Sequence, residues 1–451
     1  MNEYLFGTDG VRGRANHSPM DSETALKLGR AAAAVFRNGH HRHRIVIGKD
    51  TRLSGYMLET ALASGIVSMG TDVMLVGPLP TPGVAFITRG MRADAGIVIS
   101  GSHNDYRDNG IKFFDRDGYK LSSALEQKIE THFHQMSEAE GRATAGQIGK
   151  ASHVEDAVGR YIQFLKGSFP QRLALDGLKV VVDCSNGAGY RVAPRVLEEL
   201  GAQVIAIAAT PDGTNINQDC GSLHMEGLSK KVREVGADIG IALDGDADRV
   251  ILCDETGTVV DGDVIMALCG QMWKKRGLLK KNAIVATVMS NLALDRAMND
   301  LGIQVMRTKV GDRHVVEAMK ASGTNFGGEQ SGHMIFLDYN TTGDGMLAAL
   351  QVLVILLEEN KPLSALRKIF DPYPQVLLNV KVKEKKELSH IPEIAERIQS
   401  IEQELGKNGR FLFRYSGTEM TARIMVEGPD SSKIQQYAEE VSQLINQHLG
   451  V

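Results

Sequence analysis

Three aspartates occupy alternate positions in LDGDADRV, residues 243–250. Asp244, Asp246 and Asp248 lie between two apolar runs, DIGIAL and RVILC, which are typical of buried strands. In an extended segment alternate side chains share one side, so the three carboxylates would gather there and repel one another. A cation would neutralise them, and an all-oxygen ligand set favours Mg²⁺, Ca²⁺ or Mn²⁺ over zinc. The spacing therefore predicts a site for a hard divalent cation.

An EF-hand calcium loop is one alternative for this segment, because Glu255 stands where the loop's twelfth-position glutamate would be. Arg249 occupies the position that requires glycine, and both flanks have the pattern of strands instead of helices. We therefore exclude the EF-hand. An acidic, solvated turn is the non-functional alternative, but it does not account for three evenly spaced aspartates between buried strands.

A second polar loop, SGSHNDYRDNGIKFF at residues 100–114, follows the apolar run Ala95–Ile99. A surface turn would explain its glycines, asparagines and aspartates, but not Ser102, His103 and Lys112 so close behind a buried strand. No G-x-S-x-G motif surrounds Ser102, and the side chain of His103, the next residue, is expected to point away from it. We therefore interpret Ser102 as a hydroxyl nucleophile that works without a hydrolase-type Ser–His pair.

A third loop, GGEQSGH at Gly327–His333, has glycines that let the backbone approach a ligand closely. Glu329 and Ser331 have the acceptor and donor groups that bind neighbouring hydroxyls of a sugar. Taken alone, this motif is equally compatible with a plain turn.

A fourth loop, RYSGTE at Arg414–Glu419, is followed by Arg423. Ser416, Thr418, the backbone of Gly417 and the two arginines would form a phosphate cradle. A polar loop before a strand is the alternative.

Together the four loops indicate phosphoryl transfer on a sugar phosphate. A metal-dependent phosphatase with a serine nucleophile would share the serine and the metal, but it would not need both the sugar loop and the phosphate cradle. A sugar-phosphate-binding protein that has lost its chemistry is the non-enzymatic alternative.

The elements that position these loops have α/β character. Continuous β-branched runs begin at Arg44, Leu178 and Ala283, as expected of strands buried on both faces, and helical patterns such as Ser22–Phe36 lie between such runs. Strands that alternate with helices form parallel or mixed sheets. Three such units, spaced by roughly a hundred residues, predict three similar α/β domains with mixed sheets.

After the linker-like DPYPQ, residues 371–375, strands and helices alternate over shorter distances, which predicts a smaller C-terminal α+β domain. We expect the three α/β domains at 1–152, 153–253 and 254–370, and the α+β domain at 375–451.

The bulk properties exclude several classes of protein. The chain has 451 residues, which predicts more than one domain, and its formal net charge of −4 argues against nucleic-acid or polyanionic membrane partners. Its four cysteines are scattered, the N-terminus has no apolar signal region and no run approaches a membrane span. We therefore expect a cytoplasmic protein with reduced thiols. The cluster HHRHR, residues 40–44, is interpreted as a solvated loop instead of a metal or phosphate site.

Seven motifs follow one another along the chain: FGTDGVRG (6–13), the Ser102 loop with DNGIKFF, DGDADR (244–249), TKVGDRHV (308–315), GGEQSGH, TTGDG (341–345) and RYSGTE. In this order they resemble the motifs of the α-D-phosphohexomutases, and the resemblance runs nearly from end to end. FGTDGVRG and DNGIKFF resemble the glucosamine branch, the bacterial phosphoglucosamine mutases, more than the mannose/glucose branch.

The resemblance implies four domains around a central cleft and a phosphate carried on Ser102. It implies interconversion of glucosamine 6-phosphate and glucosamine 1-phosphate through a 1,6-bisphosphate, which feeds UDP-N-acetylglucosamine and cell-wall synthesis. One Mg²⁺ per chain and glucosamine 1,6-bisphosphate as primer are the implied cofactors. Sugar phosphates are the implied partners, and a homodimer is left open. Phosphoglucomutase or phosphomannomutase activity is the alternative.

The resemblance also assigns roles to residues. The implied catalytic residues are Ser102, Arg12, His103 and Lys112; the metal ligands are Ser102, Asp244, Asp246 and Asp248, with Arg249 beside them; the sugar ligands are Glu329, Ser331 and His333; and the phosphate ligands are Arg414, Ser416, Gly417, Thr418 and Arg423. A lysine base at position 112 would need a lowered pKa, for which Arg12 is the expected cause.

Four positions depart from the family pattern. The family loop usually reads Ala-Ser-His-Asn-Pro, whereas this chain has Gly101 and Asp105 in place of Ala and Pro. Ala247 stands where glycine is usual, and Met420 stands where proline usually follows SGTE. We expect Asp105 to place a negative charge near a phosphoserine and so to hinder the phosphorylation of Ser102.

Overall fold

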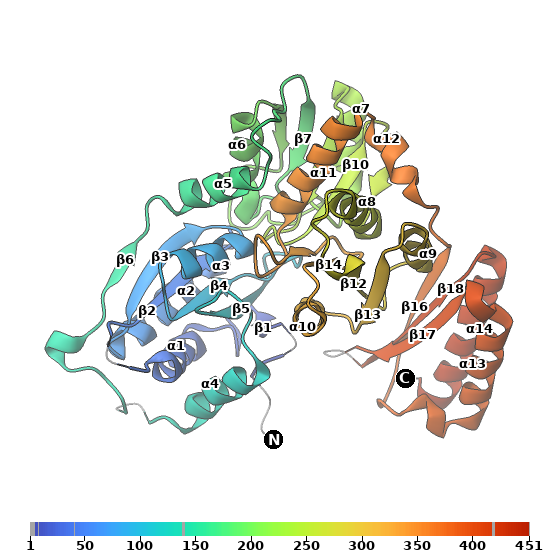
Figure 1. The fold of residues 1–451 in the computed structure, drawn as a ribbon. Helices are drawn as coiled ribbons and strands as arrows, with labels where there is room; N and C mark the ends of the chain where they lie inside the picture. Colours follow the sequence, from blue (N-terminus) through green and yellow to red (C-terminus); the bar gives the residue numbers. More distant parts are fainter. Residues whose placement is uncertain (1–4, 8, 40, 138–139, 417–419, 451) are drawn as a thin grey trace. The chain divides into compact units, whose positions relative to one another are not determined.

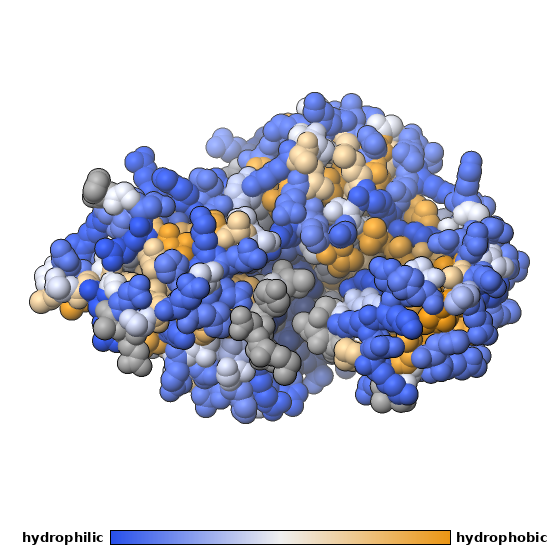
Figure 2. All heavy atoms as spheres, turned by 90° about the horizontal axis from the view of Figure 1, so that it is seen from below, coloured by the Kyte–Doolittle hydropathy of each residue, from blue (hydrophilic) through white to orange (hydrophobic). Residues whose placement is uncertain are grey.

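The structure is a computed structural model that describes residues 5–7, 9–39, 41–137, 140–416 and 420–450. These residues form four sheets and divide into two compact units, Met1–Met289 with Ile303–Ile369, and Ser290–Gly302 with Phe370–Val451. None of the helices in the described part of the chain is both long and apolar enough to span a bilayer. On the face seen in Figure 2 hydrophilic residues predominate, with apolar residues in smaller groups between them.

The first domain is a mixed sheet covered by helices on both faces (Figure 1). Strands β2, β3 and β4 are parallel, whereas β5 is antiparallel to both β4 and β1. Ile45 and Ile47 pack into a core with α1, α2 and α4, and α3 contacts β2 and β4. In sheet order the strands are β1 (Val11–Arg14), β5 (Asp108–Asp115), β4 (Ala95–Ile99), β2 (Arg44–Lys49), β3 (Asp72–Pro78) and β6 (Ala151–His153); the helices are α1 (Ser22–Phe36), α2 (Leu53–Ser68), α3 (Thr81–Gly90) and α4 (Ser123–Gln135), with a 3₁₀ turn at Ala145–Gln147.

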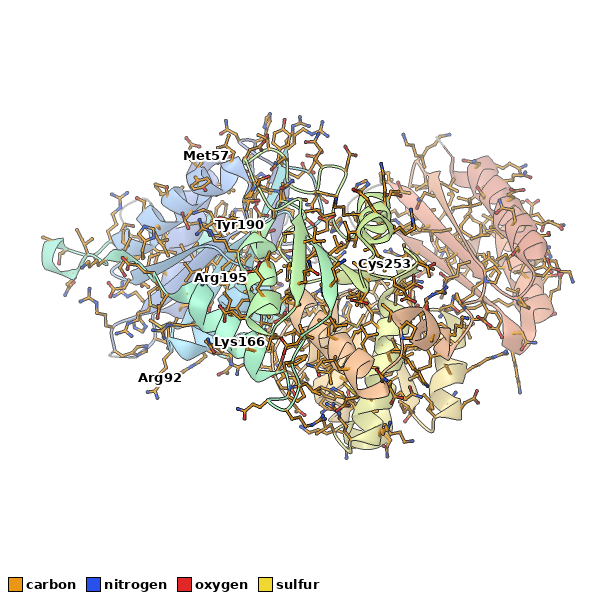
Figure 3. The ribbon with its side chains drawn as sticks, turned by 90° about the horizontal axis from the view of Figure 1, so that it is seen from above. Met57, Arg92, Lys166, Tyr190, Arg195 and Cys253 are labelled. Atoms are coloured by element: carbon orange, nitrogen blue, oxygen red, sulfur yellow. The ribbon has the colours of Figure 1, made fainter. Side chains whose placement is uncertain are left out.

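The second domain has a mixed sheet in which β8, β7 and β9 are parallel and β10 and β11 turn back antiparallel. Lys166 on α5 and Arg195 on α6, both labelled in Figure 3, lie 2.9 and 4.0 Å from carboxylate oxygens of Glu199. The strands in sheet order are β11 (Val259–Val260), β10 (Val250–Asp254), β9 (Ile239–Leu243), β7 (Lys179–Asp183) and β8 (Gln203–Ile207); the helices are α5 (Ala157–Gly167), α6 (Val192–Glu199) and α7 (Met225–Val235), with a 3₁₀ turn at Ala188–Tyr190.

The third domain has a four-stranded mixed sheet, and its long helix α11 is apolar on nearly every side because it packs against α8 and against the second domain's strands β9 and β10. The strands in sheet order are β13 (Gln304–Thr308), β12 (Ala283–Thr287), β14 (Phe326–Gly328) and β15 (Met334–Phe336); the helices are α8 (Gly262–Lys275), α10 (Asp312–Ser322), α11 (Gly345–Glu359) and α12 (Leu363–Leu366), with 3₁₀ turns at Lys280–Asn282 and Arg367–Ile369.

The second compact unit is a three-stranded antiparallel sheet with α13 and α14 packed on it, together with α9. The strands in sheet order are β16 (Gln375–Lys381), β18 (Thr421–Glu427) and β17 (Arg410–Tyr415); the helices are α9 (Leu292–Asp300), α13 (Pro392–Leu405) and α14 (Ser431–Leu449), with 3₁₀ turns at Leu388–His390 and Gly406–Asn408.

This architecture confirms the predicted fold class of three α/β domains with mixed sheets and a smaller α+β domain. The arrangement around a central cleft stays a prediction. The expected boundaries at 152/153 and 253/254 both fall inside strands, β6 and β10. β6 is exposed at all three positions, so it lacks the apolar run by which the sequence identifies strands. β10 does have that run, RVILC, but its partner β11 continues the same sheet beyond the expected boundary.

One local prediction needs correction. His43, expected to lie in a solvated loop, is buried, and its ring nitrogen lies 3.4 Å from Asp94, which also contacts His41 at 2.7 Å. His40 lies outside the described residues.

The start of α11 connects the second and third domains through one carboxylate. Asp344 caps the helix by accepting the N–H of Leu347, and its other oxygen accepts the Tyr161 hydroxyl at 2.7 Å. The next residue, Gly345, donates its N–H to the carbonyl of Ala247 in the aspartate loop. The TTGDG motif therefore supports that loop through the backbone.

We expect Asp344→Ala to lower the free energy of unfolding by about 2–4 kcal/mol, because it removes a helix cap and leaves the buried Tyr161 hydroxyl without its acceptor. Asp344→Asn keeps the capping oxygen and should cost less than half as much. The measurement is thermal melting of both variants; equal losses would show that the cap is not the stabilising contact.

Candidate active site with a three-aspartate metal centre

The three aspartates lie in the tight turn that joins β9 to β10, and all three are buried. One oxygen from each lies within 4.8 Å of the others. Oδ1 of Asp246 is buried and accepts no hydrogen bond from the described residues. Three carboxylates with convergent oxygens, and a buried Asp246 oxygen left without a hydrogen bond, fit a hard divalent cation such as Mg²⁺. The three carboxylates gather as predicted, but a tight turn brings them together, and not the extended segment that the prediction assumed.

The turn has the backbone that glycine would favour at position 247. Ala247 has a φ of +56°, in the left-handed region that costs an L-residue roughly 1 kcal/mol. The structure therefore explains why glycine is usual there. At Gly245 a Cβ atom would lie 2.5 Å from the carbonyl oxygen of Ser102, so glycine is needed for the close approach of the two loops.

Ser102 is buried at the end of β4, and its hydroxyl donates to Asp244 Oδ2 at 2.9 Å. Its φ of +53° is unusual for a serine. The carbonyl of Ser102 accepts from Arg52 Nη2 at 3.1 Å and from Asn217 Nδ2 at 2.8 Å, and its N–H donates to the Ser100 hydroxyl at 2.9 Å. These contacts fix the strained residue with its hydroxyl on the aspartate centre.

Gly101 permits part of this arrangement. A Cβ atom at this position would lie 2.9 Å from the guanidinium carbon of Arg52, a side chain that is fully buried. Because residue 101 is glycine and not alanine, the Arg52 guanidinium has room beside the serine loop and donates to the carbonyl of Ser102.

Lys112 on β5 supplies the nearest positive charge. Its Nζ lies 2.8 Å from Asp246 Oδ2 and 3.6 Å from Asp248 Oδ2. Burial alone would lower the Lys112 pKa, but the carboxylates of Asp246, Asp9 and Asp248 outweigh burial and raise it. In the ion-free site Lys112 is thus an ammonium group, and the lowered pKa expected from Arg12 is not found.

The pKa values of the three aspartates are shifted in different directions. Burial, followed by the charges of Asp248 and Asp246, raises the pKa of Asp244 well above its usual value. Burial opposes ionisation of Asp246 and Asp248 as well, but Lys112 lowers the pKa of both, and His333 also lowers that of Asp248. Without a cation, Asp244 is therefore the carboxyl that holds a proton most readily.

His103 and Arg12 also lie beside the serine loop. Burial is the main cause that lowers the His103 pKa to about 4, and Arg249 and Arg12 lower it further against Asp246 and Asp248. The imidazole is therefore neutral at pH 7. Arg12 on β1 donates to the carbonyl of Gly101 at 3.2 Å and pairs with Asp9. Arg249 donates its backbone N–H to Asp244 Oδ1 at 3.1 Å.

The GGEQSGH loop connects β14 to β15. Glu329 accepts the N–H of Gly311 at 3.1 Å, and Ser331 is exposed. The side chain of His333 is only 3% exposed, and its two ring nitrogens lie 3.5 Å from Asp248 and from Asp312. The contact with Asp248 places His333 beside the aspartate centre, and its role as a sugar ligand stays a prediction.

The fourth loop belongs to the second compact unit. Arg414 on β17 lies opposite Arg423 on β18, and the N–H of Ser416 donates to the carbonyl of Thr421. Lys385 donates to the carbonyl of Ser416 at 2.6 Å and adds a positive charge that the sequence did not suggest. Gly417 and Thr418 lie outside the described residues.

Comparison with known proteins identifies the family. Models of phosphoglucomutase/phosphomannomutase match the chain in order: α/β/α domain I at residues 3–140, domain II at 159–257, domain III at 261–373 and the C-terminal domain at 377–444. The chain belongs to this α-D-phosphohexomutase family. The resemblance inferred from the seven motifs is confirmed, and the protein is a phosphomutase of the isomerase class.

Full-length relatives lie on the amino-sugar branch. The chain is 59% identical to a phosphoglucosamine mutase of Anaeromyxobacter sp. (strain Fw109-5), over 99% of this chain and 96% of the relative. It is 58% identical to that of Myxococcus xanthus (strain DK1622), over 100% and 98%. A solved phosphoglucomutase/phosphomannomutase family protein from Burkholderia thailandensis has the same fold, with a TM-score of 0.83, 23% identity and 99% coverage of both chains.

Sequence reasoning missed several residues of this phosphohexomutase's site. The hydroxyl of Thr81, at the start of α3, donates to Asp246 Oδ2 at 2.7 Å. Asp9 and Asp312 lie inside quoted motifs without an assigned role, which is a signal that was available. Lys120 and Asn217 had no such signal, because their contacts join segments far apart in the chain.

The expected handicap at Asp105 is offset. Its carboxylate is 42% exposed and pairs with the Arg107 guanidinium, and the hydrogen bonds from Arg107 are the main cause of its lowered pKa. A neutralised, solvated carboxylate should repel a phosphoserine only weakly. Met420 is 47% exposed, and nothing in the structure explains its presence.

We expect Asp244→Asn to abolish most of the rise in melting temperature that Mg²⁺ produces, because one of three ligands loses its charge. In EDTA the variant should melt at the same temperature as the parent or higher, since carboxylate repulsion is relieved. Asp338→Asn, in an exposed pair with Lys280, is the control that should keep the full Mg²⁺ shift. An unchanged shift in Asp244→Asn would contradict the metal centre.

We expect the ion-free protein to lose stability between about pH 6.5 and pH 4 through His103. Its folded pKa of about 4 lies below the usual 6.5, so the unfolded chain binds the proton first as the pH falls. The loss at pH 5 should be about 1–2 kcal/mol. The measurement is the drop in melting temperature from pH 7 to pH 5, which His103→Gln should reduce; equal drops would refute the shift.

Proposed function

We infer that this phosphohexomutase is a phosphoglucosamine mutase, which interconverts glucosamine 6-phosphate and glucosamine 1-phosphate and so feeds amino-sugar metabolism. The observation that carries the chemistry is the Ser102 hydroxyl, held 2.9 Å from Asp244 at a centre of three buried carboxylates. The choice of an amino sugar rests on relatives with that name at 58–59% identity over nearly the whole chain.

In the proposed mechanism Ser102 carries the phosphoryl group. Phosphoserine 102 transfers it to O1 of glucosamine 6-phosphate, and Ser102 later takes the phosphoryl group at O6 from the resulting 1,6-bisphosphate. The three aspartates and the serine oxygen would hold one Mg²⁺, which would neutralise charge on the transferring group. A sugar bisphosphate primer would restore the phosphoserine whenever it is lost.

The charged residues around Ser102 supply electrostatic stabilisation. Lys112, Arg12 and Arg249 are cations that contact the serine or aspartate loop, where low solvent access strengthens their effect on a phosphoryl group. The neutral imidazole of His103 is the group beside Ser102 that is able to accept a proton from the sugar hydroxyl at pH 7. We therefore assign proton transfer to His103 and charge stabilisation to Lys112.

Substrate binding is assigned to the remaining loops. Glu329, buried, and Ser331, exposed, lie on one loop and would bind the ring hydroxyls in both orientations of the sugar. Arg414, Ser416, Gly417, Thr418 and Arg423 would bind the phosphate that does not react. The bisphosphate must turn round between the two transfers, so both loops must accept either end of the molecule.

The sugar loop and the phosphate cradle together are what distinguish this proposal from a serine phosphatase. The alternative of a sugar-phosphate-binding protein that has lost its chemistry was supported by the departures from the family pattern at Gly101 and Asp105. The positions of Arg52 and Arg107 beside these residues weaken that support. We place the enzyme in the cytoplasm with sugar phosphates as its partners, because its substrates are metabolites.

We expect Ser102→Ala to lower kcat by about 10³-fold or more in a coupled assay with glucosamine 6-phosphate, Mg²⁺ and glucosamine 1,6-bisphosphate. Intact-mass measurement should find one phosphate on the parent protein and none on the variant. The parent should use glucosamine 6-phosphate better than glucose 6-phosphate or mannose 6-phosphate. Turnover that persists in Ser102→Ala would disprove the phosphoserine mechanism, and a preference for glucose or mannose would move the enzyme to the other branch.

A further inference from the structure

The motif TKVGDRHV has no role in the mechanism above, yet two of its residues reach the first domain. Asp312 is the first residue of α10, and its Oδ2 lies 2.6 Å from Nζ of Lys120, just after β5. The Lys120 ammonium also pairs with Oδ1 of Asp9. Lys120 therefore lies between two carboxylates that come from different domains.

Asp9 in turn contacts both first-domain cations of the site. Its Oδ2 lies 3.6 Å from Nζ of Lys112, and it pairs with the Arg12 guanidinium. Burial would raise the Asp9 pKa, but Lys112, Lys120 and Arg12 together hold it well below its usual value. Asp9 is thus the hub of this network: its carboxylate contacts Lys112 and Arg12 of the site and is held in place by its ion pair with Lys120.

The position of Lys112 depends on opposing attractions. Asp246 and Asp248 draw its ammonium group toward the metal centre, at 2.8 and 3.6 Å, whereas Asp9 attracts it from the other side. If Asp9 moved away, the ammonium group would be free to settle further onto the metal ligands. A displacement of about 1 Å at a reacting centre is enough to cost roughly 10²-fold in rate.

On the other side Asp312 faces the sugar loop. Its Oδ2 lies 3.5 Å from Nε2 of His333, whose Nδ1 lies 3.5 Å from Asp248. The side chains of Lys120 and Asp312 are 13% and 15% exposed, so solvent screens their interaction less than that of a surface pair. Without Lys120, Asp9 and Asp312 would face each other as uncompensated like charges.

We propose that Lys120 and Asp312 are positioning residues that hold Asp9, and through it Lys112 and Arg12, beside Ser102. The inference rests on the proposed function, because it concerns the same site. Neither residue needs to touch the substrate, and their effect should therefore fall on kcat.

Arg313 provides a matched control. Its Nη2 lies 2.5 Å from Glu126 on α4, with side chains 19% and 11% exposed, so it joins the same two domains with a similar ion pair. It has no contact with Asp9 among the interactions of the described residues. Arg313→Met removes a tie between the domains and leaves the hub in place, whereas Lys120→Met removes the hub's support.

The experiment measures kcat, KM and melting temperature for Lys120→Met, Asp312→Asn, their double variant, Lys120→Arg and Arg313→Met. We expect Lys120→Met to lower kcat by about 10–100-fold and to change KM by less than about threefold. Arg313→Met should stay within about threefold of the parent in kcat, and Lys120→Arg should recover most of the loss. The combined loss in the double variant should be smaller than the product of the single losses, because Asp312→Asn relieves the repulsion of Asp9.

A second readout does not depend on turnover. The rise in melting temperature with Mg²⁺ should be smaller in Lys120→Met than in Arg313→Met, because the released Lys112 ammonium group would compete with the cation for Asp246 and Asp248. Equal loss of kcat in Lys120→Met and Arg313→Met, or single losses that multiply in the double variant, would overturn the proposal in favour of simple domain attachment. A parent protein that fails to turn over glucosamine 6-phosphate would instead count against the proposed function, so the two failures are distinguishable.

Discussion

The burial of three carboxylates within 4.8 Å of one another is the constraint on which the site depends. Water does not reach these groups, so the protein must supply the compensation. It does so from all three α/β domains, with Lys112 on β5, Arg249 after the aspartate loop and His333 on the sugar loop. Each partner carries charge or a proton donor, and each is itself buried or half-buried. The cluster of three aspartates is therefore also a point at which the three α/β domains are held together.

Close backbone contacts make this convergence possible. Gly245 lets the aspartate loop touch the carbonyl of Ser102, and a side chain at Gly345 would strike the backbone of Arg249 at 2.5 Å. Ser102 keeps its left-handed backbone because Arg52, Asn217 and Ser100 hold it from three directions. These hydrogen bonds offset a backbone strain of roughly 1–2 kcal/mol, and the strained conformation directs the Ser102 hydroxyl at the aspartates.

Local sequence patterns predict the helices and strands that carry the site and the gathering of the three aspartates. They do not predict the residues whose contacts join distant segments. The helix Ser22–Phe36 and the strands around Ser102 and the aspartates follow from periodicity and apolar runs, and the alternation of Asp244, Asp246 and Asp248 predicts their shared face. The roles of Lys120, Thr81 and Asn217 were not predicted, because their partners lie more than a hundred residues away and the neighbouring sequence gives no sign of these contacts. Asp105 shows the opposite error: its effect depends on Arg107, two residues away, whose direction no motif predicts.

The charges of the site are balanced by the residues that line it. Lys112, Arg12, Arg249 and Lys120 face the three aspartates together with Asp9 and Asp312, and burial raises the pKa of one aspartate, Asp244. A divalent cation adds two positive charges, and a phosphoserine adds about two negative ones at neutral pH. The pair is close to neutral, so its arrival need not rearrange the cations that the fold has already placed. A site balanced in both states is able to exchange its phosphoryl group repeatedly while the surrounding ion pairs keep the reacting atoms in place.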